Sequence, residues 1–119
     1  MQFEIIQPHY LMLLCDNDTQ FMCKMYEAFL QQNTNVQEQL QECIIHFDVI
    51  RAKKIIHTLK SSFSILGVDV CKTEIEITES DSFLSIKKIE FIRIIKKILF
   101  VYIQMEKEYT IFIQNLSKT

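Results

Sequence analysis

The chain has 119 residues, with 13 basic and 15 acidic side chains and a formal net charge of −2. That length suits one domain with one core, and the charge excludes a polycation for nucleic acid or anionic membranes, so any electrostatic function must be local. A hydrophobic fraction of 49% argues against disorder, and the single glycine and single proline disfavour a β architecture with many turns. We therefore expect one domain over residues 1–119, built from a few long helices.

The first predicted elements are a lead-in over residues 1–9 and a short apolar helix over residues 10–14. Pro8 suits a turn or the first turn of that helix. The polar stretch DNDT at 16–19 supplies N-cap residues, after which apolar side chains recur at three- and four-residue steps. This pattern predicts a long helix over residues 18–45, with the stretch NTN at 33–35 as the place where it would loosen.

Three further helices are predicted after residue 45. Asp48 is a suitable cap for a helix over residues 48–66, and Gly67, the only glycine of the chain, suits its left-handed end. A shorter helix covers residues 68–79, and the stretch ESDS at 79–82 forms a turn. The last helix covers residues 83–116; its centre is rich in β-branched residues, but its unbroken length and its three- and four-residue spacing favour a helix over a strand.

These elements predict an all-α fold, an antiparallel four-helix bundle with a short extra N-terminal helix. The four cysteines form no CxxC pair and the three histidines have no zinc-ligand spacing, so we expect reduced thiols and no metal site. The longest apolar run, ILFVYI at 98–103, is far shorter than a membrane span, and the N-terminus lacks the features of a signal peptide. We therefore expect a cytoplasmic protein that neither inserts into membranes nor binds nucleic acid.

His57 is the candidate functional residue because it lies at the centre of a polar helix face. On the helix over residues 48–66, Leu59 and Phe63 lie on the side that faces the core. On its own face, the neighbours of His57 are all polar; they are Lys53, Lys54, Lys60, Ser61 and Ser64. We therefore expect the imidazole to be exposed and not part of the core.

The charge around His57 favours phosphoryl chemistry. Residues 51–68 contain four basic side chains and no acidic one, a local charge of +4 in a chain of net charge −2. These cations disfavour a protonated imidazolium, which leaves a neutral nucleophile, and they attract a dianionic phosphoryl group. Ser61 is small enough to leave room for a partner beside the ring. The simpler alternative is an ordinary lysine-rich helix face that carries a histidine by chance.

The stretch HTLKSSFSILG at 57–67 resembles the signature of histidine-containing phosphotransfer (HPt) domains, which is approximately His-x-x-Lys-Gly/Ser-x-x-x-x-x-Gly. The resemblance covers the chain from about residue 10 to its end, through the stretches YLMLLCDNDTQFMCKMYEAFLQQ, FDVIRAKKIIHTLK and LGVDVCKTEIEITES. In the last stretch, Glu76 or Glu79 is near a glutamate common in the family. The resemblance implies a phosphorelay module without kinase activity of its own, whose partners are response-regulator receiver domains and a hybrid sensor histidine kinase.

The resemblance also implies roles for the matching residues. His57 would be the phosphoacceptor, through its outward ring nitrogen, and Lys60 would neutralise phosphoryl oxygens. Ser61 would fill the position of a small residue, with its hydroxyl near the phosphoryl group, whereas Ile56 stands where the family usually has alanine. The supporting residues would be Lys53, Lys54, Ser64 and Gly67. No cofactor is implied on this chain, because Mg²⁺ would belong to the partner receiver domain.

Two other functions stay open at this point. One is a helical adaptor that binds a receiver or kinase domain without being phosphorylated, and the other is a plain structural or dimerisation bundle. An adaptor would not need His57, Lys60 and Ser61 in register, and this chain has all three. We therefore expect phosphotransfer, with the adaptor as the alternative.

Overall fold

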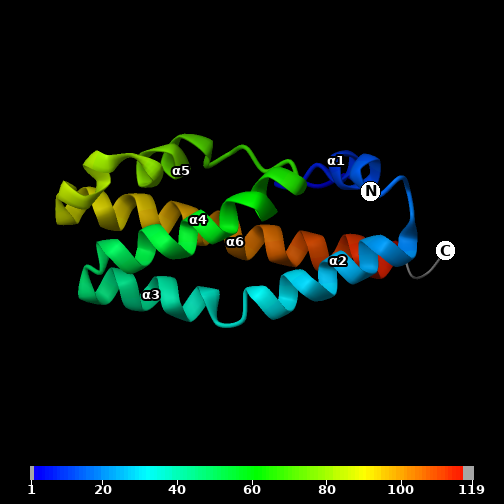
Figure 1. Ribbon diagram of the computed structural model, residues 1–119, viewed down its shortest axis with the longest axis horizontal. Coiled ribbons are helices and arrows are strands. Elements are labelled where there is room, and N and C mark those ends of the chain that lie inside the picture. Colours follow the sequence, from blue (N-terminus) through cyan, green and yellow to red (C-terminus); the bar gives the residue numbers. More distant parts are fainter. Residues whose placement is uncertain (1, 117–119) are drawn as a thin grey trace.

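The computed structural model describes residues 2–116, which contain six α-helices, one short 3₁₀-helix and no strand (Figure 1). In chain order the elements are α1 (Pro8–Leu14), α2 (Thr19–Gln32), α3 (Val36–His46), α4 (Val49–Ile65), α5 (Lys72–Glu79), η1 (Asp81–Ser85) and α6 (Lys88–Leu116). The predicted all-α fold is therefore confirmed.

The helix predicted over residues 18–45 is wrong as a single element, because the chain breaks into α2 and α3 at the NTN stretch. Side chains take the carbonyl groups at the end of α2: the Asn33 amide donates to Phe29 O at 2.8 Å, and the Thr34 hydroxyl lies 3.1 Å from Gln31 O. Asn35 then adopts a left-handed conformation, with φ of 65°. Short polar side chains that compete for backbone groups end a helix in this way.

The helix over residues 48–66 agrees with α4, since Asp48 accepts a hydrogen bond from Arg51 N at 3.1 Å as its N-cap. Its end is a Schellman turn, in which Val68 N donates to Phe63 O at 2.8 Å while Gly67 has φ of 65°. This turn uses residues 68–71, so α5 starts at Lys72 and not at residue 68.

The last predicted helix also starts later than expected. Residues 81–85 form the 3₁₀-helix η1, Ile86 is extended, and α6 begins only at Lys88. The buried ring of Phe83 packs against the ring of Phe91, with 5.9 Å between the ring centroids. This contact holds η1 against the start of α6. The connection before α6 is therefore a packed corner of the molecule.

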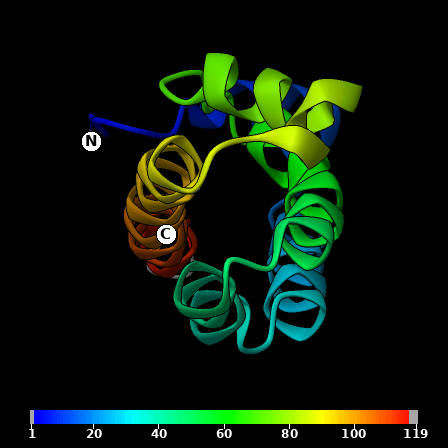
Figure 2. The same ribbon diagram turned by 90° about the vertical axis from the view of Figure 1, so that its left-hand side faces the viewer.

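The long helix α6 runs along most of the molecule. Its 29 residues span about 43 Å at 1.5 Å per residue, against a longest dimension of 48 Å. It packs against α2 and α3 on one side and α5 on the other, and α4 packs against α3 and α5 (Figures 1 and 2). The chain runs one way through α2 and α3, returns in α4, runs back through α5 and returns in α6 (Figure 1).

The N-terminal segment belongs to this packed structure. Glu108 Oε1 accepts hydrogen bonds from Ile5 N and Ile6 N, both at 3.0 Å, and Ile6 is buried. Gln7 N donates to Leu66 O at 2.7 Å, which joins the start of α1 to the end of α4. The expected lead-in over residues 1–9 is therefore anchored from Ile5 onward, and α1 begins at Pro8.

Candidate functional site

His57 lies near the middle of α4 with its side chain 71% exposed. The opposite side of α4 faces the core through Ala52, Ile56, Leu59 and Phe63, all of which are buried. Because Ile56 takes part in this core, the bulky residue before the histidine is accommodated by packing and does not touch the exposed face. The helical pattern therefore places the imidazole in solvent, as the sequence predicts.

Glu79, the last residue of α5, holds the inner nitrogen of that imidazole. His57 Nδ1 lies 3.0 Å from Glu79 Oε1 and 3.3 Å from Oε2. Since an ionised carboxylate only accepts hydrogen bonds, Nδ1 carries the shared proton, and in the neutral ring Nε2 then holds the lone pair. The contact orients the ring and leaves Nε2 as the nucleophilic atom on the solvent side.

The lysines around His57 have different environments. Lys54 and Lys60 are exposed, and both are available to an anion that approaches the imidazole. Lys53 is not: its Nζ donates to Thr78 O and Ser80 O, both at 2.9 Å. Lys53 therefore stabilises the carboxyl end of α5, and its predicted support of the site is indirect, through the position of Glu79.

The predicted local charge of +4 is too high, because acidic residues from other elements approach this face. Glu79 is one of them, and Glu42 of α3 pairs with Arg51 at 3.0 Å. Counting charges along one helix leaves out such partners. Lys53 keeps its charge but is held by carbonyl groups, so the exposed ammonium groups that can move to an anion at His57 are those of Lys54 and Lys60.

The remaining candidates lie at different distances from the ring. Ser61 is exposed one turn after His57 and borders a cavity of about 230 Å³ between α2 and α4. Ser64 and Lys60 border a second cavity, of about 390 Å³, which Glu76 and Gly67 also line. Gly67 is about 15 Å from His57 along the helix, at 1.5 Å per residue, so it acts through the fold and not at the imidazole.

Within residues 2–116, no group of three or more histidine, cysteine, aspartate or glutamate side chains is arranged to hold a metal ion. The same part of the chain has no helix with the length and apolar character needed to cross a bilayer. Cys15, Cys23, Cys43 and Cys71 are free thiols.

Comparisons of the chain with protein-family models, with curated proteins and with solved structures give no match. A functional assignment therefore depends on the residues and geometry of this chain. Its most specific arrangement is the exposed imidazole of His57, held at Nδ1 by Glu79 and flanked by Lys54 and Lys60.

Proposed function

We propose that this chain is a histidine phosphotransfer domain. In this function His57 accepts a phosphoryl group from an aspartyl phosphate of one receiver domain and passes it to the aspartate of another. The observation that carries the proposal is the contact of His57 Nδ1 with Glu79 at 3.0 Å, on a side chain that is 71% exposed. A histidine that serves only the core or an ordinary polar surface has no need of a fixed ring with a free outer nitrogen.

The proposed fold is an antiparallel four-helix bundle. In it, α2 and α3 together form one element, α4, α5 and α6 form the other three, and α1 is the short extra N-terminal helix. Packing of α4 against both α3 and α5 supports this arrangement, because it leaves only one face of α4 in solvent. That face carries His57.

The transfer step can be written in atoms. The lone pair of His57 Nε2 attacks phosphorus, an N–P bond forms, and the P–O bond to the receiver aspartate breaks with its electron pair left on the aspartate carboxylate. Nδ1 keeps its proton, so the ring becomes positive as the N–P bond forms. Glu79 stabilises that charge at 3.0 Å, and the step reverses when a second aspartate attacks the phosphohistidine.

Lys54 and Lys60 would stabilise the transferred group. Both lie on the face of His57 and are exposed, so their ammonium groups can move to the phosphoryl oxygens when a partner docks. The Ser61 hydroxyl lies one turn from the ring and would contact the same oxygens. Mg²⁺ belongs to the receiver domain in this proposal, and this chain has no cofactor of its own.

The proposed partners are receiver domains of response regulators and of a hybrid sensor histidine kinase, in the cytoplasm. Ile50, two turns before His57 on the same face of α4, is 62% exposed and would pack against an apolar surface of the receiver. Burial of such a residue around a reacting imidazole also excludes water from the phosphoryl group.

The test is incubation of the chain with phosphoramidate, and separately with receiver domains charged by acetyl phosphate, followed by intact-mass measurement. We expect a mass gain of one phosphoryl group that disappears in acid and is absent in His57→Gln. His46→Gln is the matched control, because His46 is an exposed histidine at the end of the neighbouring helix α3. Stable binding of a receiver without a mass gain would instead favour the adaptor.

A further inference from the structure

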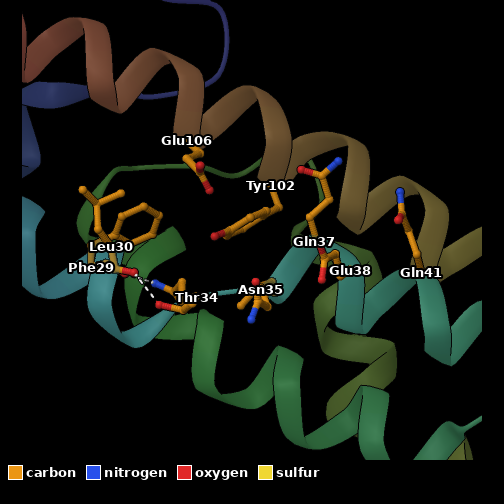
Figure 3. Close-up of a pocket in the computed structure, with 11 residues that line it drawn as sticks. Phe29, Leu30, Thr34, Asn35, Gln37, Glu38, Gln41, Tyr102 and Glu106 are labelled. Carbon is orange, nitrogen blue, oxygen red and sulfur yellow. Dashed lines mark hydrogen bonds between the residues drawn. The ribbon is translucent and has the colours of Figure 1, made fainter.

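The break between α2 and α3 borders a cavity with a volume of about 560 Å³ (Figure 3). The turn and the first residues of α3 form one wall, and α6 forms the other through Tyr102 and Glu106. His57 and Glu79 are not among the lining residues, so this cavity is separate from the proposed phosphotransfer site. A ligand of ordinary metabolite size fits such a volume.

Tyr102 has a buried hydroxyl without a partner in this cavity. The residue is 1% exposed, and within residues 2–116 its hydroxyl oxygen has no partner that meets the geometry of a hydrogen bond. Figure 3 shows the ring extending from α6 into the cavity, with its oxygen between Glu106 and the α2–α3 turn. Burial raises the pKa of Tyr102, and interaction of its hydroxyl with the Glu106 carboxylate, in the manner of a hydrogen bond, raises this pKa further. The two groups nevertheless do not meet the full geometry of a hydrogen bond, so the hydroxyl is at best weakly satisfied. Buried hydroxyls are rarely left in this state, which points to a missing partner.

The cavity favours a positive ligand. Its charged lining residues are Glu38 and Glu106, with no lysine, arginine or histidine, and neither carboxylate forms an ion pair in the described part of the chain. Further acceptors are the side-chain amides of the lining residues Asn35, Gln37 and Gln41. An uncompensated pair of carboxylates beside acceptor groups attracts a cation that donates hydrogen bonds.

Two aromatic residues that line the cavity, one from α2 and one from α6, favour a planar cation. Phe29 and Tyr102 have ring centroids 6.3 Å apart, and both rings line the cavity. A guanidinium group stacks on such rings, presents two parallel N–H donors to a carboxylate, and is more easily freed from water than an ammonium group. An apolar chain on the ligand would lie against Leu30 and Val36.

We propose that the cavity between the α2–α3 turn and α6 binds a small guanidinium compound with an apolar chain. Glu106 pairs with the guanidinium group, the Tyr102 hydroxyl accepts one of its N–H groups, and the ring of Phe29 covers its face. The side-chain amide oxygens of Asn35 and Gln37 accept hydrogen bonds from the remaining N–H groups of the guanidinium. This binding function is independent of the phosphorylation of His57.

The first test uses N-butylguanidinium and its neutral isostere N-butylurea, with affinity measured by calorimetry and the site by amide NMR shifts. We expect N-butylguanidinium to move the signals of Thr34, Asn35 and Tyr102, and N-butylurea to bind at least about ten-fold more weakly. Equal affinity of the two compounds would overturn the assignment of a cation site. Absence of shifts at the α2–α3 turn at millimolar concentration would overturn the site itself.

The second test uses variants. Glu106→Gln should weaken binding of N-butylguanidinium at least about ten-fold, whereas Glu27→Gln removes a carboxylate from the exposed face of α2 and should leave affinity unchanged. Tyr102→Phe should also weaken binding, several-fold, and at the same time raise the melting temperature of the free protein. Unchanged affinity in both Glu106→Gln and Tyr102→Phe would contradict the proposal, whatever the outcome of the phosphorylation test.

Discussion

His57 obtains its orientation from a residue of another helix. Glu79 is 26% exposed and ends α5, where Lys53 also binds the backbone. The lysine thus helps to keep the carboxylate in place although it does not approach the imidazole. In the proposed transfer, this makes Lys53 and Glu79 positioning residues, and leaves Lys54 and Lys60 to contact the phosphoryl group.

Glu79→Gln tests this role. The glutamine keeps an acceptor for His57 Nδ1 but removes the negative charge that stabilises the phosphorylated ring. Because the His57 side chain is largely exposed, we expect the transition state to lose about 1 kcal/mol of stabilisation. This corresponds to an about five-fold slower phosphoryl transfer from phosphoramidate. Glu76→Gln, on the exposed face of the same helix, is the control. Equal rates in the two variants would remove Glu79 from the mechanism.

Tyr102→Phe should make the free protein more stable. The substitution removes a buried hydroxyl that has no hydrogen-bond partner within the described residues and keeps the ring that fills the core. We expect the free energy of unfolding in urea to rise by about 1 kcal/mol without ligand. Tyr26→Phe is the contrast, because the Tyr26 hydroxyl bonds Thr110 Oγ1 at 2.7 Å and its loss should destabilise the chain.

At the scale of elements, the ends of the helices determine how the faces are presented. The Schellman turn after α4 reverses the chain so that α5 packs back on α4 and brings its last residue to His57. The same turn receives α1, because Gln7 binds the carbonyl groups of Leu66 and Gly67 at 2.7 Å each. A single glycine therefore supports both the site helix and the N-terminal helix.

Gly67→Ala should destabilise the protein by about 2 kcal/mol or more in urea unfolding. A Cβ at this position would lie 2.5 Å from Tyr10 Cδ2 and 2.8 Å from Gln7 Cβ, and the backbone φ of 65° is itself unfavourable for alanine. In a Tyr10→Ala background the effect should be smaller, because the unfavourable backbone conformation and the close approach to Gln7 Cβ remain while the clash with the Tyr10 ring is gone. Ser64→Ala changes an exposed residue in the last turn of α4 and should have little effect on stability. Equal destabilisation by Gly67→Ala and Ser64→Ala would contradict this account.

At the scale of the whole molecule, the core is uninterrupted and contains groups that must stay uncharged. Cys71 is fully buried, and burial, with a smaller contribution from Glu74, raises the pKa of its thiol to about 11 from an ordinary 9.0. Burial also raises the pKa of Tyr102 and Tyr109. Each group is therefore neutral in the folded chain at pH values where the unfolded chain already ionises.

This difference predicts alkaline unfolding. The contribution of Cys71 is intact below pH 9 and is lost as pH rises toward 11, by about 2–3 kcal/mol in the free energy of unfolding. Urea unfolding in reducing buffer at several pH values measures how the free energy of unfolding falls with pH. Cys71→Ala should flatten this dependence, although the variant is less stable at neutral pH. An unaltered slope in Cys71→Ala would contradict the prediction.

Local signals in the sequence determined the helical content, the caps and the exposed face of α4. Asp18 and Asp48 accept hydrogen bonds from amides three residues later, and Gly67 has the left-handed conformation that ends a helix. These features depend on neighbours within one or two turns, so spacing alone predicts them. The break at residues 33–35 has a local cause as well. The helical spacing of the apolar residues nevertheless continues from one side of the break to the other, and this spacing predicted one helix.

Tertiary structure alone decided which charges and polar groups meet. The contact of His57 with Glu79 joins residues 22 positions apart, and the bonds of Lys53 to the end of α5 span a similar separation. Tyr102 reaches the α2–α3 turn from a distant helix. Such contacts depend on the rotation and register of packed helices, which follow from the fit of the whole core and not from the periodicity of any one segment.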